Sequence, residues 1–481
     1  MVVFATGLLL ASGEGRAQDA PELQFEVPKR LGGDANGDRI FDGSRTPDNA
    51  LDDPLIDLRV NIPGAHCDPS AEYEWQVNGL PTQVEQLGKC RFSLRVVQGK
   101  HEVSATDSSD VSGSPVTGVV DAADHLIVSI GDSVASGEGN PDVGGYLLRG
   151  ARWLDRQCHR SMLSGAARAA LRAERGEETS RITFVPLGCS GASVPRGLLG
   201  GYRGIEPDRG TNLRPQVGQL NEIAADVDAV LINIGGNDVS FESIIRFCAG
   251  VRDCPNKRFD RGGFRESPDP DDPPLRAFVS DAVEQLSDRL DMLGDRISPA
   301  IADERVLLVE YFDPTQGPDG PCRMLGGLID RNEAEWAHDE VLGPLNDTLR
   351  EAAERHHWTF IDGVDEGFQG HGICAPSEKR WIRTPTRSFV TQGTFNPVNR
   401  LSGTLHPDGA GHAATATLIG NQLGPILGAE FSEDPIGILG QEDGLPGFAW
   451  LLIFILGGLL LLGTITLGLG LLRSRRARSD H

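Results

Sequence analysis

Ser133 stands where a stretch typical of a buried strand ends. In the segment HLIVSIGDSVASGEGNP, residues 125–141, a run with an apolar and β-branched bias leads directly into Gly131, Asp132 and Ser133. A serine on a tight turn at a strand end exposes its hydroxyl at the rim of the sheet, but it is a poor nucleophile until a base takes its proton. The position therefore predicts a nucleophile that needs a basic partner elsewhere in the chain.

Three further segments could complete an acyl-transfer site. His406, in TLHPDGAGH, can act as the base. Acyl transfer also creates an oxyanion, and each preorganised donor for it is worth about 3 to 4 kcal/mol in the barrier. The candidate donors are the backbone N–H groups of Ser133 and of Gly191, in LGCSGAS, and the side-chain amide of Asn237, in GGND. Gly191 suits this place because the missing Cβ lets a carbonyl oxygen approach the amide.

Strands that alternate with helices are expected to position these segments. Several apolar runs fit strands buried on both faces, namely LIVSI, ITFVPLG, AVLINIGG, RVLLVEYF and WTFIDG. Helical patterns lie between them, over Met162 to Arg175, Leu275 to Leu293 and Glu333 to His356. This alternation predicts a parallel sheet covered by helices on both sides, with ligands bound beyond the carboxyl ends of the strands.

The four blocks, GDS, LGCSGAS, GGND and TLHPDGAGH, occur in an order that resembles the SGNH (GDS-type) hydrolase superfamily of esterases and lipases. The resemblance covers residues 124–428 and is strongest to secreted, disulfide-containing lipases and esterases. It implies a three-layer α/β/α flavodoxin-like domain that cleaves carboxylic esters without a cofactor. By this resemblance Ser133 is the nucleophile and His406 the base, and Ser133, Gly191 and Asn237 form the oxyanion hole.

The residue that orients His406 departs from the pattern of this superfamily. Many members carry an aspartate three residues before the histidine, but that position here is Gly403. A backbone carbonyl can accept the same Nδ1–H bond, so we predict a dyad of Ser133 and His406 oriented by the carbonyl of Gly403. The rival acceptor, Asp408, is expected to cap the helix that follows.

The remaining histidines are expected to be structural. His159 lies in RQCHRS, a segment that also resembles secreted actinobacterial-type lipases, but it adjoins Cys158. His412 is expected to make a buried hydrogen bond, and His356 and His357 to sit at a helix end.

Residues 21–120 differ from the rest of the chain. Residues 21 to about 50 are rich in Gly and Asp, and short alternating runs such as YEWQVNG and RFSLRVV follow. These runs predict β-strands, and Asn78-Gly79 predicts a hairpin between two of them. With Trp75 between two cysteines, we expect a small immunoglobulin-like or PKD-like sandwich; the alternative is an irregular β-rich extension.

Eight cysteines in an exported chain favour disulfides. Proximity in the sequence suggests four pairs: Cys67–Cys90, Cys158–Cys189, Cys248–Cys254 and Cys322–Cys374. Zinc binding is the alternative, but no CxxC pair occurs.

Both ends of the chain predict export and anchoring. Residues 1–20 fit a signal peptide, although the basic n-region is missing. The uncharged run 448–472 has 25 residues and is long enough for one transmembrane helix, preceded by a linker at 429–447. The arginine-rich tail 473–481 should stay cytoplasmic, which leaves the body of the chain at the cell surface. The alternative is a surface-sorting signal that is later removed.

Charge excludes one class of partner and leaves a weak metal candidate. The net charge of -24 argues against nucleic acid, which requires clustered Lys and Arg. The segment GDANGDRIFDG places four oxygen ligands at positions 1, 3, 5 and 9 of a calcium loop, namely Asp34, Asn36, Asp38 and Asp42. Arg39 and Arg45 occupy two positions that such loops give to glycine and an acid, so a solvated acidic turn is the other interpretation.

These observations lead to three functional hypotheses. The first is a membrane-anchored serine ester hydrolase acting on lipid or other acyl esters. The second is a polysaccharide O-acetyl esterase whose N-terminal β-region binds glycan. The third is a surface adhesion protein with a degenerate hydrolase domain, against which the four intact motif residues count.

Overall fold

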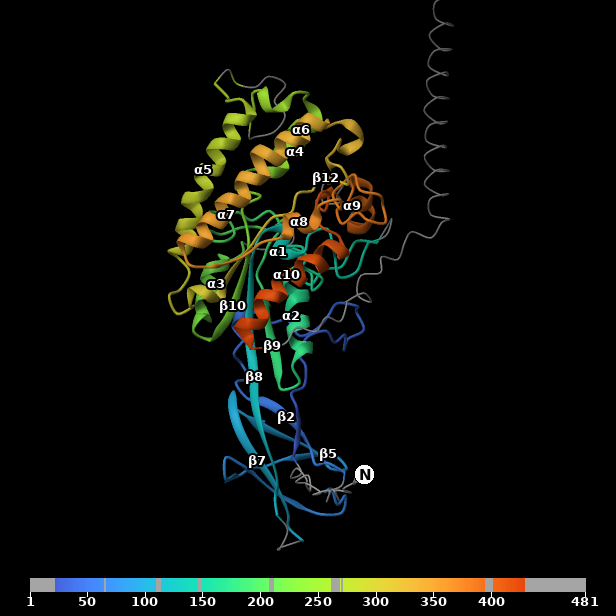
Figure 1. Cartoon of the computed structure of the whole chain (residues 1–481), viewed down its shortest axis with the longest axis vertical. Coiled ribbons are helices and arrows are strands. Elements are labelled where there is room, and N and C mark those ends of the chain that lie inside the picture. Colours follow the sequence, from blue (N-terminus) through green and yellow to red (C-terminus); the bar gives the residue numbers. More distant parts are fainter. Residues whose placement is uncertain are drawn as a thin grey trace, which may run out of the picture. The chain divides into compact units, whose positions relative to one another are not determined.

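The computed structural model describes residues 22–64, 66–109, 114–145, 149–206, 212–260, 269, 271–393 and 401–428 (Figure 1). The predicted signal peptide, linker, transmembrane helix and basic tail lie outside these residues. Within the described part of the chain, no helix combines the length and apolar character needed to cross a membrane.

Five parallel strands form the part of the sheet that carries the motifs. They are β8 (Val116–Gly131), β9 (Ser180–Pro186), β10 (Val227–Asn233), β11 (Val306–Val309) and β14 (Thr359–Ile361). Their spatial order is β9-β8-β10-β11-β14. Numbered along the chain this is 2-1-3-4-5, the order of flavodoxin-like sheets, so the predicted fold class is confirmed for this region.

Helices cover both faces of these strands (Figure 1). α2 (Gly165–Gly176) and α10 (Gly409–Leu427) pack together on one face. α3 (Gln216–Glu222), α5 (Leu275–Gly294) and α7 (Gly343–Arg355) cover the other. The shorter helices are α1 (Ser133–Ser136), α4 (Phe241–Gly250), α6 (Arg331–Ala337), α8 (Val364–Phe368) and α9 (Pro385–Gln392).

One predicted helix is interrupted. The pattern from Glu333 to His356 predicts a continuous helix, but α6 and α7 are joined by a π-turn at His338–Leu342. Pro344 follows this turn and has no N–H to continue the regular ladder, which accounts for the change in hydrogen bonding.

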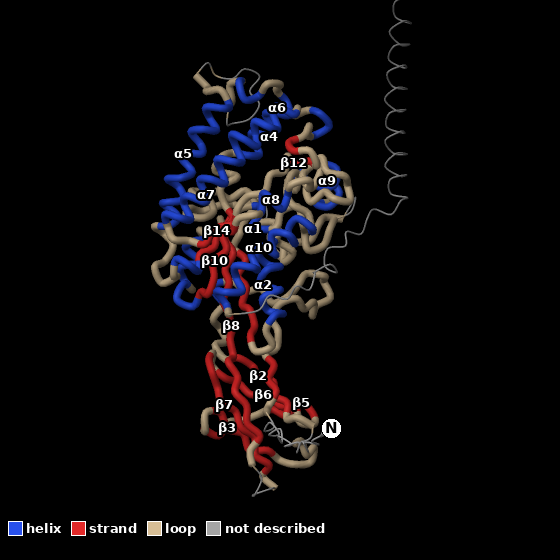
Figure 2. Tube along the Cα trace, viewed as in Figure 1, coloured by secondary structure: helices blue, strands red, loops and turns tan. Residues whose placement is uncertain are grey.

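β8 belongs to two different arrangements of strands (Figure 2). Its residues 116–122 pair antiparallel with β7 (Gly99–Asp107), whereas its residues 123–131 pair parallel with β9 and β10. β7 continues the sheet to β3 (Tyr73–Val77) and β4 (Leu80–Pro81). The eight-stranded sheet is therefore mixed, and the predicted boundary between residues 120 and 124 falls inside one strand.

A second sheet packs against the antiparallel part of the first. Its order is β1 (Gln24–Glu26), β2 (Ile56–Asn61), β6 (Arg91–Val96) and β5 (Glu85–Gly88). Side chains of both sheets meet in one apolar core, in which the rings of Trp75 and Phe92 lie 4.8 Å apart. The predicted hairpin joins β3 to β4, with Asn78 and Gly79 both at positive φ as such turns require.

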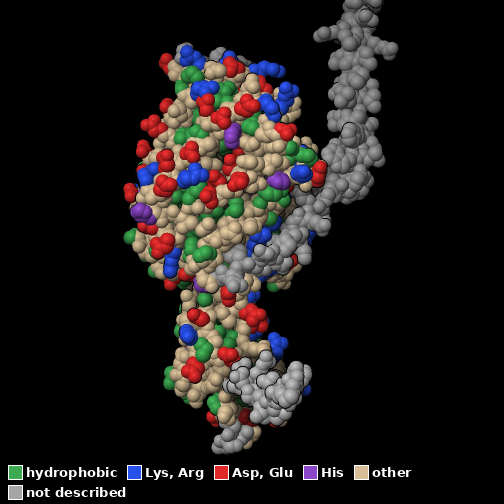
Figure 3. Space-filling view, viewed as in Figure 1, with side chains coloured by type: hydrophobic (Ala, Val, Ile, Leu, Met, Phe, Trp, Pro, Cys, Tyr) green, Lys and Arg blue, Asp and Glu red, His purple; other side chains and the backbone are tan. Residues whose placement is uncertain are grey.

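The eight cysteines form the four pairs that proximity predicts: Cys67–Cys90, Cys158–Cys189, Cys248–Cys254 and Cys322–Cys374. On the face drawn in Figure 3, Asp and Glu side chains are interspersed with Lys and Arg. Two short strands, β12 (Gln316–Gly317) and β13 (Gly320–Pro321), lie beside the fourth disulfide.

Trp75→Ala should destabilise the helices of the α/β region as well as the two-sheet core. The side chain is 4% exposed, and such a truncation costs about 3–5 kcal/mol. Because β8 belongs to both regions, we expect the helical circular dichroism signal to melt at a lower temperature. Leu80→Ala, at a position that is 70% exposed in the neighbouring β4, is the control and should change little. Unchanged helix melting in Trp75→Ala would show that the two regions unfold independently.

Candidate active site

The turn that carries Ser133 is held by the neighbouring strand. Gly131 ends β8 with φ 141°, and a Cβ there would lie 2.0 Å from the carbonyl oxygen of Asn233 in β10. The Asp132 amide donates to the same oxygen at 3.0 Å. The Asp132 carboxylate accepts from the Val134 amide at 3.0 Å and so caps α1, which begins at Ser133. These contacts place the Ser133 hydroxyl beyond the carboxyl end of β8.

His406 lies beside this hydroxyl. Its Nε2 is 2.8 Å from Ser133 Oγ, although the two residues are 273 positions apart. Burial lowers the pKa of His406 below its ordinary value, so the ring is neutral near pH 7 and can accept a proton. The pair has the geometry of a nucleophile and its base.

A different backbone carbonyl from the predicted one faces Nδ1 of His406. The carbonyl of Gly403 accepts from the backbone amide of His406 at 3.1 Å, which closes a tight turn. Nδ1 instead lies 3.2 Å from the carbonyl oxygen of Thr404, with Leu405 at φ 64° between them. The Gly403 carbonyl, which we predicted as the acceptor, is thus used by the turn itself, and hydrogen bonds with the backbone of Thr404 and Ser402 stabilise the protonated ring instead.

The Asp408 carboxylate caps the helix that follows His406. It accepts from the amides of Ala410 at 2.9 Å and Gly411 at 3.2 Å, at the start of α10. This is the helix cap expected from the sequence.

The two other motif turns are tied to the nucleophile turn. The amide of Cys189 donates to the carbonyl of Gly131 at 3.0 Å, which fastens the turn of residues 187–193 to the end of β8. Asn237 follows β10, and its Nδ2 donates to the carbonyl of Ala192 at 2.9 Å. Gly191 has φ 82°, and a Cβ there would lie 2.3 Å from the Tyr202 hydroxyl. Ser133, Gly191, Asn237 and His406 are all half-buried, whereas most residues around them are buried.

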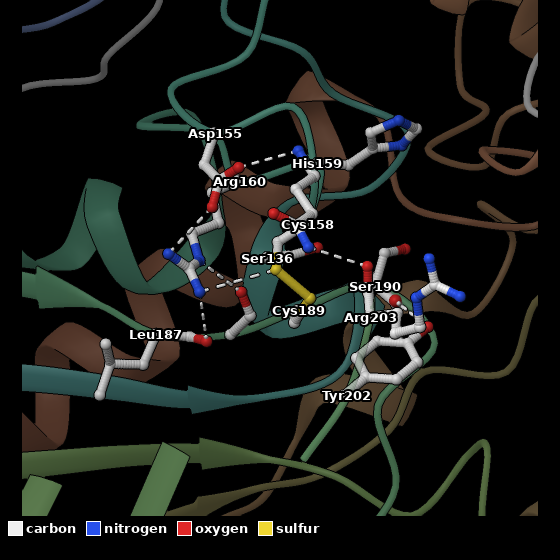
Figure 4. The surroundings of a disulfide bond; sticks show 12 residues. Ser136, Asp155, Cys158, His159, Arg160, Leu187, Cys189, Ser190, Tyr202 and Arg203 are labelled. Carbon is white, nitrogen blue, oxygen red and sulfur yellow. Dashed lines mark hydrogen bonds and ion pairs between the residues drawn. A yellow bond between two sulfur atoms is a disulfide. The ribbon is translucent and has the colours of Figure 1, made fainter. Parts of the chain in front are cut away.

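A disulfide and an arginine hold the segment of residues 187–190, which leads to Gly191 (Figure 4). Cys189 is bonded to Cys158, and the amide of Ser190 donates to the Cys158 carbonyl at 3.1 Å. The Arg160 guanidinium donates to the carbonyls of Gly188 at 2.9 Å and Leu187 at 3.1 Å. The Tyr202 hydroxyl donates to the Ser190 carbonyl at 2.9 Å, so carbonyls on both sides of Cys189 have fixed partners.

The model of the GDSL-like Lipase/Acylhydrolase family matches residues 129–414, a span that contains all four motif blocks. The chain belongs to this family. It is accordingly a carboxylic ester hydrolase.

Several solved structures are similar to this chain. An extracellular lipase from Streptomyces rimosus is 20% identical, with 63% of this chain and 98% of that chain covered and a TM-score of 0.40. A phospholipase A1 from Streptomyces albidoflavus is 21% identical, with coverage of 62% and 99% and a TM-score of 0.39. A family two carbohydrate esterase from Clostridium thermocellum is 12% identical, with coverage of 85% and 100% and a TM-score of 0.28. No curated protein sequence matches the chain.

Sequence reasoning missed Glu138, a fully buried acid in this GDSL-family site. Its carboxylate accepts from His159 Nδ1 at 2.8 Å, and the His159 ring stacks on Trp153 with the centroids 4.5 Å apart. Burial alone would raise the pKa of Glu138, but the charge of His159 and its hydrogen bond lower it to about 2. Burial alone would lower the pKa of His159, but Glu138 raises it to about 9. The only sequence signal is the position of Glu138, five residues after Ser133 in the loop SGEGNP.

Tyr311, just beyond β11, was also missed. Its buried hydroxyl donates to the Asp132 carboxylate and accepts from the Gly236 amide at 3.1 Å. It therefore bridges the first and third motif turns. Burial raises the pKa of Asp132 to about 7. Nothing in the residues around Tyr311 indicates this contact, because it joins positions 179 apart.

The remaining candidates lie away from the nucleophile or serve local structure. His412 is buried and accepts from the Gly165 amide at 3.2 Å, as expected for a structural histidine. In the calcium-loop candidate, Asp34 and Asp42 accept from backbone amides of their own segment. Among the residues that the structure describes, no cluster of three or more His, Cys, Asp or Glu side chains could hold a metal ion.

Asp408→Ala should lower stability but not turnover. The change removes the two cap bonds at the start of α10, which costs about 1 kcal/mol. The rate of ester hydrolysis should stay near that of the unaltered protein, because the carboxylate faces helix amides and not His406. Urea denaturation and initial rates measure the two effects, and Asp408→Asn, which keeps a capping oxygen, is the control. A large rate loss in a folded Asp408→Ala protein would show that Asp408, and not a backbone carbonyl, orients His406.

Proposed function

We propose that the chain hydrolyses carboxylic esters through an acyl-enzyme on Ser133. His406 Nε2 takes the hydroxyl proton as Ser133 Oγ attacks the ester carbonyl carbon. The carbonyl oxygen becomes an oxyanion that accepts hydrogen bonds from the amides of Ser133 and Gly191 and from Asn237 Nδ2. His406 then gives its proton to the departing alcohol. In the second half of the reaction His406 takes a proton from a water molecule, which attacks the acyl carbon, and Ser133 regains its proton as the acid leaves. The 2.8 Å contact between Oγ and Nε2 is the observation that carries this proposal.

We infer that the machinery is a dyad with a backbone orienter. The Thr404 carbonyl at 3.2 Å favours the tautomer that carries its proton on Nδ1 and leaves Nε2 free to accept one. A carbonyl also stabilises the imidazolium, although with less charge than a carboxylate supplies.

Lipid or other acyl esters are the proposed substrates, with polysaccharide O-acetyl groups as the second candidate. The N-terminal two-sheet region, which we propose to be an immunoglobulin-like or PKD-like sandwich, is the feature that favours a glycan. A panel of acyl esters of increasing chain length, with phospholipids and acetylated glycans, separates the two. A strong preference for acetyl groups would remove the lipase assignment. A degenerate adhesion domain is disfavoured, because Ser133 and His406 are intact and in contact.

The catalytic region is proposed to work outside the cytoplasm. Four disulfides suit an oxidising compartment. We propose a signal peptide at residues 1–20, a β-region at 21–120, a hydrolase domain at 124–428, a linker at 429–447 and a membrane helix at 448–472 with the tail 473–481 in the cytoplasm.

A chain truncated after Gly444 should be soluble and as active as the full chain. All the residues of the proposed mechanism precede position 429, and the apolar run follows an acidic segment that contains Gly and Pro. Membrane fractionation and ester hydrolysis of both chains measure this. Retention of the truncated chain in the membrane would mean that another segment binds lipid.

An organophosphonate should label Ser133, and Ser133→Ala should lose both the label and ester hydrolysis. The phosphonate reacts only with a hydroxyl whose proton a base accepts, and Ser133 is the hydroxyl within reach of His406. Mass spectrometry locates the label, and circular dichroism checks the fold. Ser287→Ala, on α5, is the control and should keep both properties. Equal labelling of Ser133→Ala would refute the assignment.

A further inference from the structure

Glu138, five residues after Ser133, accepts hydrogen bonds from side chains of four separate segments of the chain. The side chain is fully buried, and four side chains donate to its carboxylate. The donors are His159 Nδ1 at 2.8 Å, Ser190 Oγ at 2.6 Å, Ser402 Oγ at 2.9 Å and Gln392 Nε2. Two of these segments matter for the reaction: Ser190 adjoins Gly191 of the oxyanion turn, and Ser402 begins the short loop that leads to His406.

The loop of Glu138 also packs directly against the base. Gly139 has φ 86°, and a Cβ there would lie 2.9 Å from Cβ of His406. The Arg383 guanidinium donates to the Gly139 carbonyl at 2.7 Å, while the Arg383 amide donates to the His406 carbonyl at 2.9 Å. The loop of residues 137–140 therefore shares a partner, Arg383, with the loop that carries His406.

Packing accounts for the glycine at position 403. A Cβ at Gly403 would lie 2.7 Å from Nε2 of Gln392 and 2.9 Å from Cα of Gly139. An aspartate has no room there unless this packing changes. The side chain that takes the space, Gln392, is itself a donor to Glu138. The space at position 403 is thus taken by a side chain that itself binds a buried acid on the loop that follows Ser133.

We propose that Glu138 is a positioning residue that fixes the oxyanion turn and the His406 loop relative to Ser133 and places a negative charge near the histidine. This proposal rests on the proposed ester hydrolysis and deepens it. Glu138 does not touch the reacting atoms. It acts through Ser190 on the turn of Gly191, through Ser402 on the loop of His406, and through its field on the imidazolium that forms during the reaction.

The charged groups around the histidine fix the sign of the pH effect. Burial lowers the pKa of His406, and the negative charges of Glu138 and of Glu242 in α4 oppose that lowering. His412, on α10, is neutral, because burial lowers its pKa to about 3. His159, the cation paired with Glu138, keeps Glu206 as a partner in Glu138→Gln. The variant therefore removes a negative charge that favours the imidazolium, and the pKa of His406 falls further. Since the neutral ring is the base, the acid limb of kcat/KM should move to lower pH.

The test compares Glu138→Gln with Glu206→Gln on a simple acyl ester. Glu206 accepts from the other nitrogen of His159 at 3.5 Å and pairs with Arg156 at 2.8 Å, so it is a carboxylate of the same cluster on the far side of His159. We expect Glu138→Gln to lower kcat and kcat/KM together by about 100-fold, as misplacement of catalytic groups does, with little change in KM. Its acid limb should shift to lower pH, and Glu138→Asp should recover part of the rate. Glu206→Gln should leave the rate and the acid limb near those of the unaltered protein.

A folded Glu138→Gln protein with unaltered kcat and an unmoved acid limb would overturn the proposal. The same holds if Glu206→Gln produces an equal loss, because the effect would then belong to the charge of His159. If Glu138→Gln does not fold, Ser190→Ala and Ser402→Ala each remove one link and keep the acid. Both should lower kcat several-fold, and unaltered rates in both would overturn the proposal. Failure of the proposed function is distinct, since the unaltered protein and Ser133→Ala would then hydrolyse esters at the same rate.

Discussion

The hydrogen bond between Ser133 Oγ and His406 Nε2 is the contact on which the rest of this site depends. It joins residues 273 positions apart at 2.8 Å. For the two atoms to meet, the end of β8 and the turn before α10 must lie at the same edge of the sheet. The packing of α10 against α2, and of both against the parallel strands, satisfies this condition. The fold thus acts on the chemistry by bringing the first and last motif blocks together.

The proposed oxyanion donors depend on a second constraint, which is the fixing of short turns. A donor is useful only if it already points at the developing charge, so movement of the Gly191 turn would remove much of its effect. The Cys158–Cys189 disulfide, Arg160 and Tyr202 hold that turn, and Glu138 binds it through Ser190. Most of these partners are buried, whereas the motif residues are half-buried. The residues that hold the turns are therefore mostly buried, while the motif residues themselves remain partly exposed to solvent.

Local patterns were enough to predict the parts of this structure that depend on neighbouring residues. The parallel strands, the Asn78-Gly79 hairpin and the Asp408 cap follow from apolar runs, turn residues and capping residues. The continuity of β8, the bridge from Tyr311 to Asp132 and the four donors to Glu138 depend on contacts between distant segments. The choice of Thr404 over Gly403 depended on the path of a three-residue turn. No sequence pattern reports such contacts, because ordinary Glu, Gln, Ser and Tyr residues make them.

The most direct test is a crystal structure of the protein after reaction with an organophosphonate. Its tetrahedral phosphorus stands for the carbon of the tetrahedral intermediate, and its P–O oxygen stands for the oxyanion. We predict that this oxygen lies about 2.7–3.1 Å from the amide nitrogens of Ser133 and Gly191 and from Asn237 Nδ2, with Nε2 of His406 beside Ser133 Oγ. A phosphonyl oxygen that faces solvent, or a phosphorus atom bonded to any other residue, would contradict the mechanism.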